Sequence, residues 1–142
     1  MSLVEDGLEL SGVGFGDFEA GRLERFSSLV GRWSFRGVTS RIRAYPAVQL
    51  AARRLATDLG FGFTYDAWRQ AVSLAVLMDH WEVCGLQPRT FALIGDGYGF
   101  CGALIRRLVS GATLLQVDLP KILIFQVNTI LGADPDASLS LL

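Results

Sequence analysis

"FALIGDGYGFCGALIRRL", residues 91–108, decides the fold class, because a short apolar run passes directly into a glycine-rich loop and then into an amphipathic segment. A continuous apolar run of this length is typical of a parallel strand that is buried on both faces. We therefore expect a strand over residues 90–94 and a helix over 100–109. "ATLLQV", residues 112–117, predicts a second buried strand, and a further helix is expected over 120–131. The order strand, helix, strand, helix predicts two parallel neighbouring strands.

The part of the chain before this stretch predicts helices. Residues 44–60 and 64–85 carry apolar positions at helical spacing, and each ends at a glycine. We divide the chain into a mainly helical N-terminal segment, residues 1–88, and the first part of an incomplete Rossmann-like α/β domain, residues 89–142. Another glycine cluster, at residues 12–16, is interpreted as a loop or turn because no strong strand precedes it.

Two glycine patterns overlap in the loop after the first strand, and they predict different ligands. Gly95, Gly97 and Gly99 form G-x-G-x-G, a pattern of S-adenosylmethionine (SAM) sites. Gly97, Gly99 and Gly102 form G-x-G-x-x-G, the pattern of dinucleotide sites. The first motif glycine normally follows the strand directly. A strand that ends at Ile94 therefore favours SAM, whereas a longer strand favours NAD(P).

The apolar run ends at Ile94, so Gly95 is the first glycine after the strand. The sixth position counted from Gly95 is Phe100, and its ring is too large for the close helix–strand packing expected of a third dinucleotide glycine. The G-x-G-x-G register is therefore favoured. Asp118 follows the second strand and would lie beside the glycine loop, where a carboxylate can accept hydrogen bonds from both ribose hydroxyls.

"FALIGDGYG" followed by "LLQVDLP" resembles the SAM-binding half of class I methyltransferases, and in particular bacterial sugar O-methyltransferases. The resemblance covers roughly residues 64–125, including the helical segment "YDAWRQA". It implies a SAM cofactor, a small-molecule substrate with a sugar as the candidate methyl acceptor, and backbone approach to the methionyl group at the three loop glycines (Gly95, Gly97 and Gly99). It further implies that Asp118 holds the ribose and that Leu119 lies near the adenine.

The chain departs from the methyltransferase pattern at Leu93, where many class I enzymes have an acidic residue. Asp96 is the candidate substitute and would face the methionyl ammonium. Tyr98 either faces the cofactor or packs within the loop. No residue is assigned as the catalytic base. His80, the only histidine, lies on a predicted helix and is interpreted as a partly buried structural residue.

Composition excludes several other classes of protein. The chain has 142 residues, 51% of them hydrophobic, and its net charge of −1 gives no basic surface for nucleic acid. The longest apolar stretch, residues 122–133, is too short to span a membrane, and no signal peptide is recognised. Cys84 and Cys101 lack metal or redox spacing, so we expect no metal site and partly buried, reduced thiols in a cytoplasmic protein.

The sequence predicts too few strands for an independent sheet. Only two strands are recognised, and an uncovered edge of a parallel sheet is a site of association. The expectation is an N-terminal fragment of a longer SAM-dependent O-methyltransferase, inactive alone, that self-associates through this edge. Two alternatives remain: an NAD(P)-binding oxidoreductase fragment, and a non-catalytic α/β fragment that associates with another chain.

Overall fold

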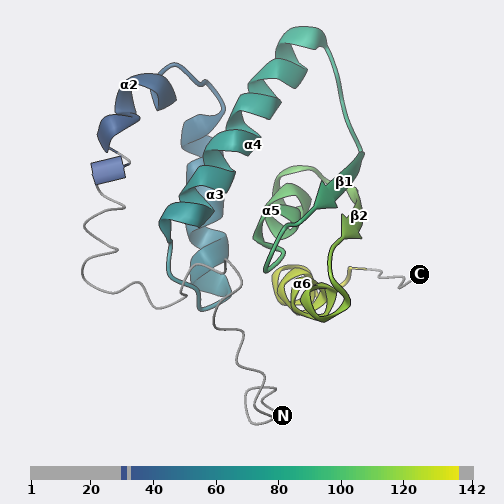
Figure 1. Cartoon of the computed structure of the whole chain (residues 1–142). Helices are drawn as coiled ribbons and strands as arrows, with labels where there is room; N and C mark the ends of the chain where they lie inside the picture. The colour runs from purple at the N-terminus through teal and green to yellow at the C-terminus, as the bar shows by residue number, and fades with distance from the viewer. Residues whose placement is uncertain (1–29, 32, 138–142) are drawn as a thin grey trace.

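A computed structural model describes residues 30, 31 and 33–137, which form five helices and a two-stranded parallel sheet (Figure 1). The glycine cluster at residues 12–16 lies outside the described residues. The elements in chain order are α2 (Arg36–Thr39), α3 (Tyr45–Asp58), α4 (Tyr65–Cys84), β1 (Thr90–Ile94), α5 (Phe100–Leu108), β2 (Thr113–Val117) and α6 (Pro120–Ala133). The strand–helix–strand–helix order predicted for the second half is confirmed.

Local signals in the sequence determine where the long helices begin and end. The Thr64 side chain accepts a hydrogen bond from the Ala67 N–H at 3.2 Å and begins α4, and Gly85 ends it in the left-handed conformation. The cap of α3 comes from elsewhere in the chain. The Asp79 carboxylate, on α4, accepts the N–H groups of Arg43 and Ala44 at 2.7 and 2.8 Å, so the two helices are joined at the start of α3.

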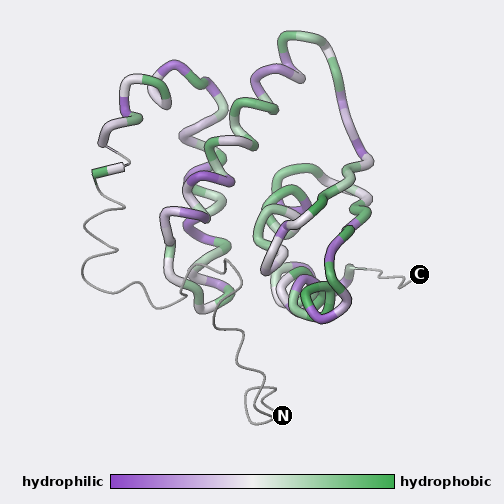
Figure 2. The backbone as a smooth tube through the Cα atoms, viewed as in Figure 1, coloured by the Kyte–Doolittle hydropathy of each residue, from purple (hydrophilic) through white to green (hydrophobic). Residues whose placement is uncertain are grey.

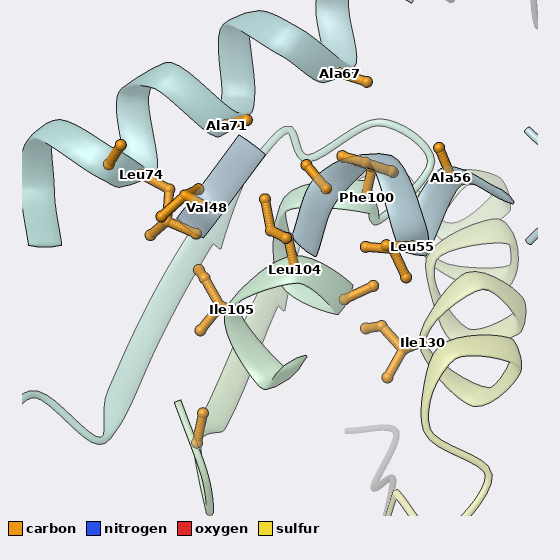
Figure 3. Close-up of a cluster of buried hydrophobic side chains, with 14 residues drawn as sticks. Val48, Leu55, Ala56, Ala67, Ala71, Leu74, Phe100, Leu104, Ile105 and Ile130 are labelled. Atoms are coloured by element: carbon orange, nitrogen blue, oxygen red, sulfur yellow. The ribbon is translucent and has the colours of Figure 1, made fainter. Parts of the chain in front are cut away.

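The core lies where α3, α4, α5 and α6 meet. Val48 and Leu55 from α3 and Leu74 from α4 are almost fully buried, and they surround Leu104 of α5 (Figure 3). Ile130 brings α6 into the same cluster. Alanines at the contacting positions of α3 and α4 allow the two helices to approach closely, which leaves α5 between this pair and the sheet.

The two strands pair in parallel from Thr90↔Thr113 to Ile94↔Val117. Their inward side chains, Phe91, Leu93 and Leu114, pack against the core. α5 and α6 also contact each other. Figure 1 shows the glycine loop, the end of β2 and the start of α6 gathered below the strands, at the opposite end of β1 from the end of α4.

The outward face of the sheet is uncovered, and the expectation that both faces are buried was wrong. Ile94 is 81% exposed, and Leu115 and Val117 are about half exposed, among the described residues. Figure 2 shows apolar colouring along both strands. A continuous apolar run predicts two covered faces, but here α5 covers only the side of Phe91 and Leu93.

We expect the uncovered sheet face to cause self-association in solution, because exposed contiguous apolar surface of this kind promotes protein contacts. The double substitution Ile94→Thr and Leu115→Thr should lower the association constant at least tenfold, measured by sedimentation velocity. Val83→Thr is the matched control, because it removes an exposed valine of α4 whose exposed fraction lies between those of Ile94 and Leu115. A monomeric wild-type chain at high micromolar concentration would contradict the expectation.

Candidate functional site

The glycine loop begins directly at the end of β1. The strand ends at Ile94, and the Gly95 N–H donates to the Val117 carbonyl at 3.0 Å, which continues the ladder by one bond. Gly95, Gly97 and Gly99 have φ of 71°, 62° and 82°, a region that strongly favours glycine. The boundary at Ile94 agrees with the G-x-G-x-G register.

Asp96 binds the amino end of α5 through its side chain. Its two carboxylate oxygens accept the N–H groups of Cys101 and Gly102 at 3.0 and 2.8 Å, and the Gln116 amide lies 3.4 Å away. These two N–H groups belong to the first turn of the helix, where a bound anion would be expected. A side-chain carboxylate therefore already fills the anion position of this loop, a role for Asp96 that the sequence did not predict.

The surroundings of Asp96 alter the proton affinity of two groups. Burial raises the pKa of the Asp96 carboxyl above its ordinary 3.8, and the nearby charge of Asp118 acts in the same direction. The hydrogen bonds from Gly102, Cys101 and Gln116 oppose that increase in pKa. Burial, together with the charge of Asp96, raises the pKa of the Cys101 thiol to about 12, so this thiol is protonated at neutral pH.

Close packing requires two glycines at this loop. A Cβ on Gly102 would lie 3.1 Å from an Asp96 carboxylate oxygen and 3.2 Å from a Leu114 methyl, and it would also meet the Gln116 amide. A Cβ on Gly99 would lie 2.8 Å from the Cα of Gln126 in α6. Gly102 thus packs α5 on the strands as a third dinucleotide glycine does, so packing alone does not separate the two motif registers.

Asp118 follows β2 and faces the start of α6. Its carboxylate accepts the Leu119 N–H at 2.8 Å and the Gln126 side-chain amide at 2.9 Å. Asp118 is partly exposed, so its remaining lone pairs are accessible, and Leu119 beside it is 56% exposed. The structure therefore brings Asp96 and Asp118 to the same edge of the sheet, as the sequence predicted for the loop and Asp118.

Two glutamines complete the site, and the sequence interpretation missed both. Gln116 points inward from β2 beside Asp96, and Gln126 is almost fully buried on α6 beside Asp118. Their side-chain oxygens are buried without a hydrogen-bond partner among the described residues. A buried acceptor without a donor costs about 1–3 kcal/mol, so these two oxygens lower the stability of the fold. The signal available in the sequence was a glutamine within each of two mainly apolar segments, Gln116 in "ATLLQV" and Gln126 in "KILIFQVNTIL".

The other candidate residues lie in different surroundings. Tyr98 is partly buried, and its ring lies edge-on to Phe125 with centroids 6.2 Å apart. His80 and Cys84 are exposed, not partly buried as expected, and they lie within 4 Å of each other on α4. They sit toward the end of α4, far from the glycine loop (Figure 1). The predicted partial burial of His80 and Cys84 was wrong. Apolar side chains occur around most of α4, so the sequence does not show which side of the helix faces the core.

Two kinds of feature are absent from the part of the chain that the structure describes. No helix there combines the length and apolar character needed to cross a bilayer. No group of three or more histidine, cysteine, aspartate or glutamate side chains there is placed to hold a metal ion.

Comparisons of the chain with protein-family models, with curated proteins and with solved structures found no match. The function is therefore inferred from the geometry and electrostatics of the glycine loop.

Alanine in place of Gly99 or Gly102, which are closely packed, should lower the stability of the fold more than alanine at a glycine with open space around it. Gly102→Ala should destabilise the fold by about 1–3 kcal/mol because the added methyl overpacks the helix–strand contact. Gly99→Ala should do at least as much, since it adds strain at positive φ to a backbone clash. Gly37→Ala in α2 is the control, because no atom lies within 4 Å of its Cβ. Urea unfolding measures the differences, and equal effects at Gly37 and Gly102 would refute the packing argument.

Asp96 should make stability fall as pH rises. Its folded pKa lies above the ordinary 3.8, so the folded state binds this proton more tightly than the unfolded state does. The free energy of unfolding therefore decreases as pH rises from about 3.8 through the folded pKa. Asp96→Asn should remove that decrease, whereas Asp136→Asn, at an exposed carboxylate, should keep it. Urea unfolding across this pH range measures the effect. If the free energy of unfolding of the wild-type chain rises with pH relative to that of Asp96→Asn, the direction assigned to the pKa shift of Asp96 is wrong.

Proposed function

We propose that residues 89–142 belong to a Rossmann-like domain that binds SAM, and that the protein serves SAM-dependent O-methyl transfer with a sugar as the acceptor. The observation that carries this proposal is the Asp96 carboxylate at the amino end of α5. We further propose a cytoplasmic location, which the two free thiols, Cys84 and Cys101, support.

The charge at the loop favours a cationic ligand over a pyrophosphate. A dinucleotide site leaves the first-turn N–H groups of the helix free for phosphate oxygens. Here Asp96 already occupies the N–H groups of Cys101 and Gly102, and Asp118 adds a second carboxylate nearby. A pyrophosphate would have to displace a carboxylate and face like charge. SAM instead carries a sulfonium and an ammonium, which two carboxylates attract.

The hydrogen-bonding groups of the loop also fit a nucleoside with an amino-acid tail. Asp118 retains lone pairs for ribose hydroxyls, and exposed Leu119 offers an apolar surface beside them for an adenine. The carboxylate of Asp118 accepts hydrogen bonds, whereas a phosphate ligand needs donors.

NAD(P) binding remains the second candidate because of one observation. Gly102 makes the close helix–strand contact expected of the third glycine in G-x-G-x-x-G. The end of β1 at Ile94 and the occupied amino end of α5 both oppose it. A direct comparison of the two ligands decides between the candidates.

S-adenosylhomocysteine should bind the chain more tightly than NAD does, measured by calorimetry. Asp118→Ala should weaken that binding by about 1.5–3 kcal/mol, because charge-assisted hydrogen bonds to the ribose are lost. Asp136→Ala is the matched control, since this exposed carboxylate lies beyond the far end of α6, about 20 Å from Asp118. A preference for NAD, or unchanged affinity in Asp118→Ala, would reject the SAM proposal.

A further inference from the structure

A cavity of about 470 Å³ lies between the end of α3, the segment after it, the glycine loop and one face of α6. Its volume falls within the range of small-molecule sites, about 300–1,000 Å³. The eight described residues that line it are Asp58, Leu59, Phe61, Tyr98, Phe125, Asn128, Thr129 and Gly132. Asn128 and Gly132 are exposed, so the cavity opens to solvent along α6.

The cavity adjoins the candidate cofactor loop. Tyr98 belongs to the loop, and its ring contacts Phe125 of α6 at the cavity wall. Phe125 is the neighbour of Gln126, which binds Asp118. Because helical residues follow one another by about 1.5 Å along the axis, the wall of the cavity and the cofactor-side face of α6 are adjacent surfaces of one helix.

The lining favours an uncharged ring that carries hydroxyl groups. Three aromatic rings, from Phe61, Tyr98 and Phe125, offer apolar faces against which the C–H groups of a ring can pack. Asn128 and Thr129 provide an amide and a hydroxyl for hydrogen bonds with ligand hydroxyls. A few polar groups among apolar walls are the usual composition of a specific small-molecule site.

The charge in the lining is already neutralised. Asp58 is the one charged side chain among the eight described lining residues, and its carboxylate lies 2.6 Å from an Arg107 guanidinium nitrogen. A charged ligand would therefore meet no unpaired opposite charge in the lining and would lose its hydration on entry. A neutral polyol avoids that loss and can still donate a hydroxyl to Asp58.

We propose that this cavity binds the methyl acceptor, a neutral hydroxylated ring of monosaccharide size, and this assignment rests on the proposed function. In the transfer, an acceptor hydroxyl oxygen forms a bond to the methyl carbon of SAM. The bond from that carbon to the sulfonium sulfur breaks and leaves its electron pair on sulfur, which yields S-adenosylhomocysteine. The hydroxyl proton leaves to water at the open side of the cavity. Tyr98, at the junction, positions the two ligands against each other.

Saturation-transfer NMR on the full chain tests the site with methyl glucoside as the neutral probe and glucuronate as its charged counterpart. Methyl glucoside should bind, and glucuronate should bind at least fivefold more weakly. Gly132→Leu places a side chain in the cavity, since a Cβ there already lies 3.0 Å from a Leu59 methyl, and should weaken methyl glucoside at least tenfold. Asn128→Ala, at an exposed position that tolerates alanine, should weaken it about threefold.

Ile124→Ala is the matched control, because this residue is exposed on α6 one turn before Asn128 and does not line the cavity. All three variants should keep the wild-type affinity for S-adenosylhomocysteine within twofold. The cavity assignment is overturned if methyl glucoside does not bind, if glucuronate binds as well, or if Gly132→Leu and Ile124→Ala behave alike. If methyl glucoside binds but S-adenosylhomocysteine does not bind at all, the proposed cofactor is rejected, and with it the role of the sugar as methyl acceptor. The cavity would then still be a binding site for a neutral sugar.

Discussion

The hydrogen bonds from the Cys101 and Gly102 amides to the Asp96 carboxylate hold the end of β1 against the first turn of α5, and the site depends on this contact. It fixes the path of the glycine loop between strand and helix. It also requires a residue without a side chain at Gly102, since Asp96 and Gln116 occupy the space where a Cβ would lie. The same carboxylate reverses the usual charge preference of a helix amino end. One residue thus determines loop geometry and packing together, and it occupies the position that an anion would take.

Elements with local signals could be predicted from the sequence. β1 ends at Ile94 and α4 runs from its Thr64 cap to Gly85, because the cap, the glycine and the apolar run each act within a few residues. The capping role of Asp96 could not be predicted in this way. Asp96 lies three residues before Gly99, the N-cap residue of α5, and reaches the helix only because the intervening loop turns back.

The remaining differences arise from tertiary contacts. The hydrogen-bond partners of the Gln116 and Gln126 side-chain amides depend on how α5 and α6 pack against the strands. Sequence spacing does not encode this packing. The coverage of the sheet is a similar case. Ala92 and Ile94 are as apolar as Phe91 and Leu93, so the pattern does not reveal that helices cover only one side.

The pairing of the two strands also has a dynamic consequence. β1 and β2 share a single ladder, and in the described part of the chain no third strand shields either outer edge. α3, α4 and α5, in contrast, hold most of the fully buried side chains. Local opening is easiest where few buried contacts must break. The strand amides are therefore expected to exchange with deuterium before those of the three core helices, so that the loop opens from its strand side while its helix side stays ordered.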